Sequence, residues 1–399
     1  MISINYKNLG IELDLEKLAP VLERIKKQPT PAFEAIKTDL GSIEKKSQNY
    51  KQYENVILIG NGGSRTSSWA FYNSLFSFRN DVHFEFLPSA EPELINSLKE
   101  KYPRENTLVL VISKSGTNIN NIEPLLSFLG YPVLVISENK NNLLSNIAKI
   151  RNWEKIAHPA VGGRYAGMTS CGLVPAYLMG LDIKEIYAGA ESGYKKYNCQ
   201  VEIEKNDALK MAAYFHKLEE SGYTEIFSSI YSSALFGFFP LIVQLIHENT
   251  GKNGQGQTIF GDYSPESQHH TNQRLFGGRK NVVALLMEVK KSLQDFPIEV
   301  PEDIKNEELS GVTLENINGI PAHKTLSFDM QGVWGHCIEK NIPVAVLTVN
   351  EINEKTMGEF MVFWQYFTMY SSLLRNQNPF DQPEVERSKN ISFQLRFQK

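Results

Sequence analysis

Two stretches of the chain decide the fold class: Asn55–Ser64 reads NVILIGNGGS, and Thr107–Thr117 reads TLVLVISKSGT. Each begins with an apolar run of strand length and ends in a turn of glycine, serine or threonine. Segments of helical length follow, at Thr66–Phe78 and Ile119–Leu129. A strand, a turn and a helix in this order predict a βαβ unit with a parallel sheet.

The same alternation continues on both sides of these stretches. Further strands are predicted at Val82–Leu87, Pro132–Ile136, Thr224–Ser228, Asn281–Val289 and Pro343–Val349, and further helices at Glu91–Tyr102, Thr169–Gly180, Tyr231–Glu248, His323–Lys340 and Glu354–Arg375. We therefore expect an α/β protein with two subdomains, each a mainly parallel sheet flanked by helices. Their predicted bounds are 51–205, with connecting helices, and 206–375. Residues 1–50 are expected to form an N-terminal helical arm, and 376–399 a C-terminal arm.

Composition fits two domains and excludes several classes of protein. The chain has 399 residues, against roughly 150 per domain, and a formal charge of −4, so a basic nucleic-acid-binding surface is not indicated. The three cysteines are widely spaced and form no CxxC, which argues against a zinc site or disulfide framework and for a reducing compartment. The N-terminus lacks a signal-peptide pattern, and the most apolar stretch, Ser232–Ile246, is too short to span a membrane. We expect a cytoplasmic protein without a membrane partner.

The two turns have the composition of an anion site. The first offers Gly63 and Ser64, and the second contains Ser113, Lys114, Ser115 and Thr117. Backbone N–H groups at a helix start bind anions, and parallel strands bring both turns to one sheet edge. The spacing matches neither GxGxxG nor a P-loop. Taken singly, each turn also fits a tight connection with a capped helix; together they favour a phosphate site.

Here the sequence resembles a known family. GNGGS followed by SKSGT is similar to a sugar isomerase (SIS) domain. Four later segments resemble motifs of the glucose-6-phosphate isomerase family: VGGRY at 161–165, ENTGK at 248–252, QH at 268–269 with Gln273, and FDQ at 380–382 followed by Val385, Glu386 and Lys389. The resemblance implies interconversion of D-glucose 6-phosphate and D-fructose 6-phosphate through a cis-enediolate, as in glycolysis and gluconeogenesis. It implies no metal and no organic cofactor.

The resemblance also assigns roles to individual residues. Glu248 becomes the base that moves a proton between C1 and C2, and Arg164 the cation that stabilises the enediolate. His269 and Lys389 assist ring opening, with His269 entering from the neighbouring subunit of a homodimer. Substrate contacts are implied for Gln382, at the phosphate, and for Gln244, one helical turn before Glu248.

Each of these residues also has a simpler interpretation. Glu248 closes an apolar helix, where the dipole disfavours an acid, but it could be an exposed carboxylate. Arg164 could form a surface salt bridge, and Lys389 near the terminus could be a solvated charge. His269 and His270 could bind a metal, although neighbouring strand residues point to opposite faces and no HExxH accompanies them.

Several positions depart from the family pattern, and two rival functions remain. Asn61, Asn118, Asn120 and the segment 261–268 differ from the motifs, which leaves sugar selectivity open. One rival is a SIS-type isomerase of another hexose phosphate, such as mannose 6-phosphate. The other is a non-catalytic sugar-phosphate sensor, which would keep the serine-rich turns but would not need Glu248, His269 and Lys389 together.

Overall fold

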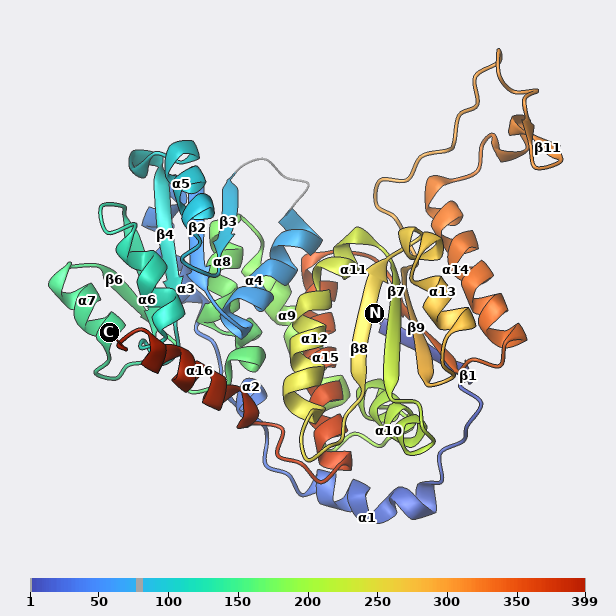
Figure 1. Cartoon of the computed structure of the whole chain (residues 1–399), viewed down its shortest axis with the longest axis horizontal. Coiled ribbons are helices and arrows are strands. Elements are labelled where there is room, and N and C mark those ends of the chain that lie inside the picture. Colours follow the sequence, from blue (N-terminus) through green and yellow to red (C-terminus); the bar gives the residue numbers. More distant parts are fainter. Residues whose placement is uncertain (1, 77–81, 399) are drawn as a thin grey trace.

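A computed structural model describes residues 2–76 and 82–398, and its strands form two five-stranded sheets with helices packed between them (Figure 1). The first sheet has the order β3-β2-β4-β5-β6 and is parallel throughout. Its strands are β2 (Asn55–Gly60), β3 (His83–Leu87), β4 (Thr107–Ile112), β5 (Val133–Ser137) and β6 (Glu154–Ala157). The central strands β2, β4 and β5 are buried at every position because helices cover both faces.

Three helices cover one face of the first sheet: α5 (Pro92–Lys101), α6 (Ile119–Leu126) and α7 (Leu143–Ile150). On the other face, α4 (Gly63–Phe71) and α8 (Ser170–Leu178) join the main core, and the π-helical segment η2 (Tyr72–Phe76) continues α4. Because α4 begins three residues after β2 ends, its N-terminus lies at the carboxyl edge of this sheet.

The second sheet has the order β1-β12-β9-β7-β8, and β1 alone runs antiparallel to its neighbour. The strands are β1 (Ile2–Asn8), β7 (Glu225–Tyr231), β8 (Thr258–Tyr263), β9 (Val282–Val289) and β12 (Val344–Val349). Helices α13 (Asn272–Gly277) and α14 (Ala322–Glu339) cover one face. The small hairpin β10 (Glu308–Leu309) and β11 (Val312–Thr313) lies on a segment that projects from the body (Figure 1).

The long helix α15 (Glu354–Leu374) joins the two halves, because it is buried at every position from Thr356 to Leu374. It packs against α9 (Ile183–Tyr197), α10 (Asp207–Glu220) and α12 (Phe239–Thr250). The remaining helices are α1 (Leu15–Lys26), α2 (Ala32–Ala35), α3 (Leu40–Ser47), α11 (Ser233–Gly237), α16 (Glu384–Leu395), and the 3-10 segments η1 (Gln48–Gln52), η3 (Arg104–Asn106), η4 (Gly163–Met168), η5 (Glu266–His269) and η6 (Leu314–Ile317).

The predicted α/β class with two mainly parallel sheets is confirmed, and the differences are local. Strands β6 and β8 were not predicted, and residues 1–50, expected as a helical arm, begin with strand β1. The helix predicted at Tyr231–Glu248 is wrong at its start, because Tyr231 still belongs to β7 and the helix is divided at Phe238. Part of the helix predicted at Thr66–Phe78 falls on residues 77–78, outside the described residues. Within the described ranges, no helix combines the length and apolar character that crossing a membrane requires.

Candidate active site

The two serine-rich turns lie side by side, because β2 and β4 are adjacent and Gly60 pairs with Ile112. The first turn also packs closely against η4 at Gly163. A Cβ added at Gly63 would lie 1.9 Å from the carbonyl oxygen of Gly163, so only glycine fits there. The turn of residues 61–64 is therefore held against the residue that precedes Arg164.

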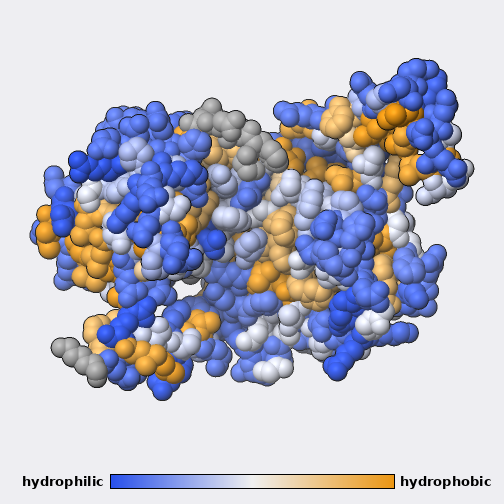
Figure 2. Space-filling model, turned by 45° about the horizontal axis from the view of Figure 1, so that its top comes forward, coloured by the Kyte–Doolittle hydropathy of each residue, from blue (hydrophilic) through white to orange (hydrophobic). Residues whose placement is uncertain are grey.

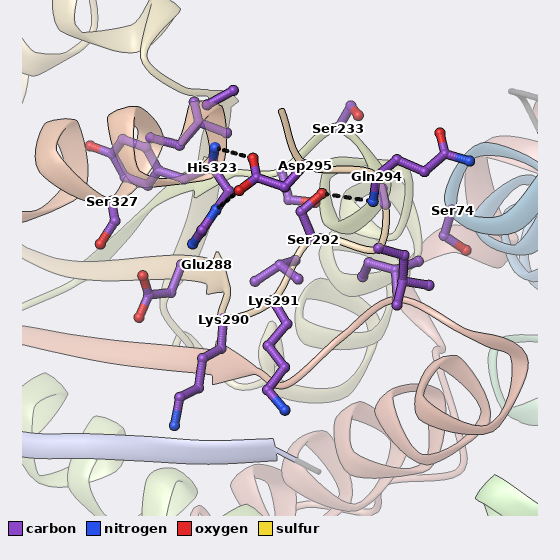
Figure 3. A pocket seen from close by; sticks show the side chains of 18 of the residues that line it. Ser74, Ser233, Glu288, Lys290, Lys291, Ser292, Gln294, Asp295, His323 and Ser327 are labelled. Atoms are coloured by element: carbon purple, nitrogen blue, oxygen red, sulfur yellow. Dashed lines mark hydrogen bonds and ion pairs between the residues drawn. The ribbon is translucent and has the colours of Figure 1, made fainter. Parts of the chain in front are cut away.

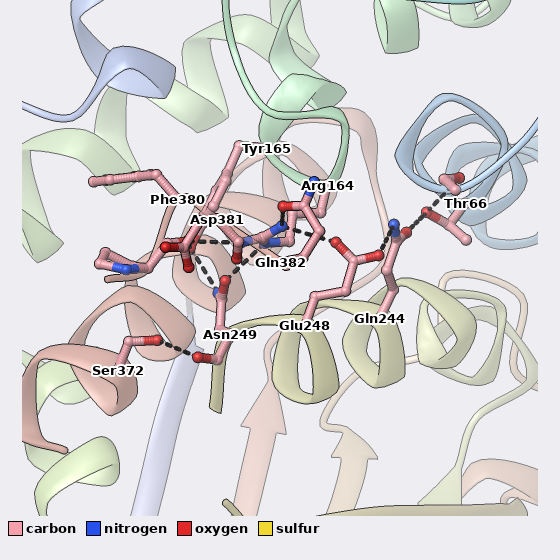
Figure 4. Close-up of polar contacts among 12 residues, drawn as sticks. Thr66, Arg164, Tyr165, Gln244, Glu248, Asn249, Ser372, Phe380, Asp381 and Gln382 are labelled. Atoms are coloured by element: carbon pink, nitrogen blue, oxygen red, sulfur yellow. Dashed lines mark hydrogen bonds and ion pairs between the residues drawn. The ribbon is translucent and has the colours of Figure 1, made fainter. Parts of the chain in front are cut away.

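Arg164 is 3% exposed and uses all five of its N–H groups within the chain (Figure 4). Its acceptors are Glu248 Oε2 at 2.8 Å, Gln382 Oε1 at 2.7 Å, Asn249 Oδ1 at 2.7 Å, and the carbonyl oxygens of Pro379 at 2.8 Å and Asp381 at 3.0 Å. We call these residues the Arg164 cluster. A buried guanidinium with a full set of acceptors is fixed in position and keeps its charge.

Glu248 lies near the C-terminal end of α12 and connects the Arg164 cluster to the turn region. Its Oε2 accepts from Arg164, and its Oε1 accepts from the Gln244 amide at 2.8 Å. The Glu248 side chain is 25% exposed, so the carboxylate is open to a ligand on one side. The Gln244 amide nitrogen would lie 3.2 Å from a Cβ added at Gly62, which has a φ of +58°. Arg164, Glu248, Gln244 and the first turn are thus linked by a continuous series of contacts.

The segment 378–382 is fastened to the end of α12 by an ion pair. Lys252 Nζ lies 2.7 Å from Asp381 Oδ1, and the hydrogen bond from Lys252 holds the pKa of Asp381 below its usual range. The Lys252 side chain is only 10% exposed. This pair holds the backbone carbonyls that Arg164 uses as acceptors.

The predicted phosphate residues are partly assembled. Ser64 and Ser113 are buried at the carboxyl edge, 6% and 4% exposed. The hydroxyl of Thr117 donates to Ser115 Oγ at 3.2 Å in the exposed part of the second turn. The Lys114 side chain turns toward β5, and its Nζ lies 3.8 Å from Glu138 Oε1.

The structure does not bring His269 or Lys389 to the Arg164 cluster. Lys389 lies on exposed α16 and pairs with Glu386 at 2.7 Å. His269 lies in η5, beyond the end of β8, whereas His247, next to Glu248, accepts a hydrogen bond from the Ile259 N–H near the start of β8. The strand from Ile259 to Tyr263, roughly 13 Å long at about 3.3 Å per residue, separates His247 from the segment that leads into η5.

His269 is exposed in an open groove of about 550 Å³ between η5, α13 and α14, which we call the His269 groove. Its other lining residues include Gln268, Gln273, Phe328 and His336. Among residues 2–76 and 82–398, no group of three or more His, Cys, Asp or Glu side chains is arranged to hold a metal ion.

A larger hollow of about 880 Å³ opens at the carboxyl edge of the second sheet (Figure 3). Asp295 accepts from the backbone N–H of His323 and pairs with its ring, which fixes the start of α14 on one wall. None of the predicted site residues lines this hollow. The Arg164 cluster, and not the larger hollow, is therefore the candidate active site.

Sequence reasoning missed several residues of this site. Asn249 lies inside the ENTGK segment but was given no role, although it accepts from Arg164 and donates to the Tyr165 hydroxyl at 2.6 Å. The Pro379 and Asp381 carbonyls have no sequence signal at all, because any residue supplies a carbonyl. Thr66, whose hydroxyl donates to Gln244 Oε1 at 2.7 Å, was placed only inside a helix.

The departures from the family pattern have structural roles. Asn61 donates to Asn121 Oδ1 at 2.6 Å, which ties the first turn to α6. Asn118 caps α6 by accepting from the Asn120 N–H at 3.2 Å. The Asn120 side chain accepts in turn from Arg396 of the C-terminal segment at 3.2 Å.

Two parallel-sheet subdomains, with hydroxyl-rich turns at one sheet edge and a carboxylate–guanidinium pair beside them, define a sugar-phosphate isomerase of the SIS fold. A sequence model described as phosphoglucose isomerase matches residues 20–398. The chain therefore belongs to the phosphoglucose isomerase family.

Relatives agree with this assignment, and solved structures share the fold. The probable glucose-6-phosphate isomerase of Methanococcus maripaludis is 30% identical over 377 residues, covering 90% of this chain and 82% of the relative. The glucose-6-phosphate isomerase of Methanocaldococcus jannaschii is 30% identical over 362 residues, covering 88% and 86%. A hypothetical protein from Thermus thermophilus shares the fold with a TM-score of 0.87 at 24% identity, covering 99% of both chains. A glucose-6-phosphate isomerase from Chlamydia trachomatis does so with a TM-score of 0.76 at 16% identity, covering 99% of this chain and 88% of its own.

Proposed function

We propose that this chain is an aldose–ketose isomerase that interconverts D-glucose 6-phosphate and D-fructose 6-phosphate. The observation that carries the proposal is the contact between Glu248 and a fully bonded, buried Arg164, directly beside two turns suited to a phosphate. A phosphate sensor would have no use for this carboxylate–guanidinium pair, so the enzyme is favoured over the sensor.

The proton transfer follows from the position of Glu248. With the sugar in open-chain form, the carboxylate takes the proton from C2 of glucose 6-phosphate. The electrons of that C–H bond form the C1–C2 double bond, and the negative charge moves to the carbonyl oxygen at C1. The same carboxyl then returns its proton to C1, while the hydroxyl proton at O2 passes to the oxygen at C1. C2 thereby becomes the carbonyl carbon and the ketose is formed. A single base suffices because C1 and C2 are neighbours and the cis-enediolate presents both to one face.

Charge balance explains the contact between Glu248 and Arg164. Before the reaction, the guanidinium charge is balanced by the carboxylate at 2.8 Å. When Glu248 accepts the proton it becomes neutral, and the Arg164 charge is uncompensated at the moment the enediolate charge develops. A fixed, permanently charged guanidinium can stabilise that oxyanion without exchanging a proton. Arg164 has no spare N–H, so it acts through its charge or after releasing one of the two acceptors on its shared nitrogen.

The phosphate group is proposed to bind at the two turns. Ser64 and the N-terminal N–H groups of α4 offer donors from one side, and Ser113, Ser115 and Thr117 from the other. Lys114 adds positive charge nearby, Gln382 is expected to donate a hydrogen bond to the phosphate, and Gln244 is a further substrate contact beside Glu248. Binding the non-reacting phosphate places C1 and C2 over Glu248, which is how remote binding energy is used for positioning.

Ring opening requires an acid that the cluster itself does not contain. We propose that His269 of the partner subunit supplies it in a homodimer, because within one chain His269 is exposed and far from Glu248. Exposed apolar side chains lie in this half of the chain: Phe328 lines the His269 groove, Leu293 and Phe296 line the larger hollow, and Leu309 lies on the projecting segment. Figure 2 shows hydrophobic surface on that segment. Lys389 is proposed to assist once α16 closes over the site.

The compartment is proposed to be the cytoplasm. All three cysteines are buried and unpaired, as expected in a reducing environment.

One assay tests the activity and the proton step together. The purified chain is given fructose 6-phosphate in deuterated water, and formation of glucose 6-phosphate and mannose 6-phosphate is followed in parallel. We expect glucose 6-phosphate as the main product, with solvent deuterium entering at C2. Deuterium at C2 would exclude a hydride transfer, in which the hydrogen of C1 moves directly to C2. Mannose 6-phosphate as the main product would favour the broader isomerase.

A further inference from the structure

Thr66 is joined to the proposed base by a chain of two hydrogen bonds (Figure 4). Its hydroxyl donates to Gln244 Oε1 at 2.7 Å, and the Gln244 amide nitrogen donates to Glu248 Oε1 at 2.8 Å. Thr66 lies in the first turn of α4, two residues after Ser64, whereas Gln244 and Glu248 lie one turn apart on α12. The chain therefore connects the helix of the phosphate turn to the helix of the base.

The direction of both hydrogen bonds is fixed by chemistry. An ionised carboxylate can only accept, so the NH₂ side of the Gln244 amide must face Glu248. The amide oxygen then faces α4, where it needs a donor, and the Thr66 hydroxyl supplies one. The hydroxyl also lies 3.2 Å from the Gly62 carbonyl oxygen, but the contact with Gln244 is the shorter one. A Cβ added at Gly62 would lie 3.2 Å from the amide nitrogen, so glycine at this position leaves space for the Gln244 amide beside the turn.

We propose that Thr66 is a positioning residue for the isomerase reaction, acting through Gln244 to hold the Glu248 carboxylate in place. The inference deepens the proposed function and rests on it. Arg164 fixes one carboxylate oxygen, and the Thr66–Gln244 pair fixes the other, so both rotation and displacement of the carboxylate are restrained. Because Thr66 and Ser64 lie in one helical turn, the proposed phosphate site and the proposed base are held at a constant separation.

The test compares Thr66→Val with Thr66→Ser. Valine keeps the branched shape and removes the donor, whereas serine keeps the donor. We expect Thr66→Val to lower kcat roughly five- to tenfold, the effect of one neutral hydrogen bond, with KM for fructose 6-phosphate unchanged within about twofold. Thr66→Ser should restore kcat. If the Thr66 hydroxyl instead bound the phosphate directly, its removal in Thr66→Val would raise KM and the inhibition constant of inorganic phosphate. That result would overturn the proposal.

A double-mutant cycle separates this role from a general effect on α4. If Thr66 acts through Gln244, adding Thr66→Val to Gln244→Ala should lower kcat no further than Gln244→Ala alone. Additive losses would contradict the proposal, as would kcat within twofold of wild type for Thr66→Val. The matched control is Ser74→Ala, which removes a hydroxyl that donates to the Ala70 carbonyl at 2.7 Å in the continuation of α4. An inactive wild-type chain would refute the proposed function itself, whereas failure of only the Thr66 arms leaves that function standing.

Discussion

The Arg164 cluster and the His269 groove differ in how completely one chain builds them. In the cluster, every N–H of Arg164 has an acceptor, and the acceptors come from α12 and the 378–382 segment. In the groove, His269 is exposed, and its motif neighbours Gln268 and Gln273 line an open surface. Burying a charge is costly unless its partners are in place. A single chain supplies all the partners of Arg164, so the cluster is complete without a second copy. The groove is open to solvent, as the proposal that His269 serves a partner subunit requires.

The largest effect should come from the centre of the cluster. We expect Glu248→Gln to lower kcat by about three decades with little change in KM, because the amide keeps the shape but cannot accept a proton. Glu204→Gln, at an exposed glutamate outside the site, is the control. Near-normal turnover of Glu248→Gln would mean that the Arg164 cluster is not the active site.

A second prediction concerns what holds the cluster's backbone in place. Arg375, at the end of α15, bonds to Glu219 Oε2, and Glu219 Oε1 accepts from the Gly256 N–H at 2.6 Å. This arrangement lies just before the 378–382 segment. We expect Glu219→Gln to lower the free energy of unfolding by about 3 kcal/mol, since it leaves a buried guanidinium without its counter-charge. Glu220→Gln, at the exposed neighbouring residue, should change it by less than about 0.5 kcal/mol in urea unfolding.

The same pair predicts a pH dependence. Burial alone would raise the pKa of Glu219, but the His216 ring 4.0 Å away and the charge of Arg375 hold it at about 2, against an ordinary value of 4.5. A lowered pKa means stabilisation that is complete above about pH 4.5 and is lost as the pH falls toward 2. Between about pH 4.5 and pH 2, the free energy of unfolding of Glu219→Gln should therefore fall less steeply with decreasing pH than that of the wild type. Identical acid profiles of the wild type and the variant would contradict it.

The sequence predicted the buried central strands of the first sheet but missed two strands of the second sheet. The buried strands β2 and β4 were located to the residue, because a continuous apolar run that ends in glycine or serine is typical of a parallel strand covered on both faces. Strand β8 was missed because Gly261 and Asp262 interrupt its apolar pattern. Strand β1 was missed although its residues alternate, since polar side chains occupy the exposed face of an edge strand.

Within the candidate site, Glu248, Arg164 and two of their partners, Gln244 and Gln382, were named from the sequence, whereas the other partners were not. Glu248 and Arg164 were identified through motifs, and the structure shows them in contact. The carbonyls of Pro379 and Asp381, and the hydroxyl of Thr66, depend on how distant segments meet, which no local pattern encodes. His269 and Lys389 were identified in the same way, but a single chain does not bring them to the site, so their roles stay predictions.

The groove can be tested by mixing variants. His269→Ala alone should lose about two decades of kcat, as for a general acid. Re-paired equal amounts of His269→Ala and Glu248→Gln chains make about half the dimers mixed, each with one intact site, so about a quarter of wild-type activity is expected for a two-fold dimer. If the re-paired mixture stays at the level of the separate variants, His269 serves its own chain and the groove is no half-site.

The smallest effect on ligand binding is expected at Lys114, whose environment is intermediate between the buried Arg164 cluster and the exposed His269 groove. Its side chain is 41% exposed and its ammonium nitrogen lies 3.8 Å from Glu138 Oε1, so Lys114 is neither buried like Arg164 nor unpartnered. If it also attracts the substrate phosphate, Lys114→Ala should weaken binding of 6-phosphogluconate roughly tenfold, at the lower end of a charge-assisted hydrogen bond.

Lys140 provides a matched control for Lys114, because its ammonium contacts the same carboxylate at 3.0 Å and is 75% exposed. Removing either lysine takes one positive charge from Glu138, so an effect of overall charge would be similar in both variants and would fade with added salt. A specific contact from the turn between β4 and α6 would appear only in Lys114→Ala and would persist at high salt. Equal losses in the two variants, measured by titration calorimetry, would remove Lys114 from the phosphate site and leave the anion to the hydroxyls and to the N–H groups of α4.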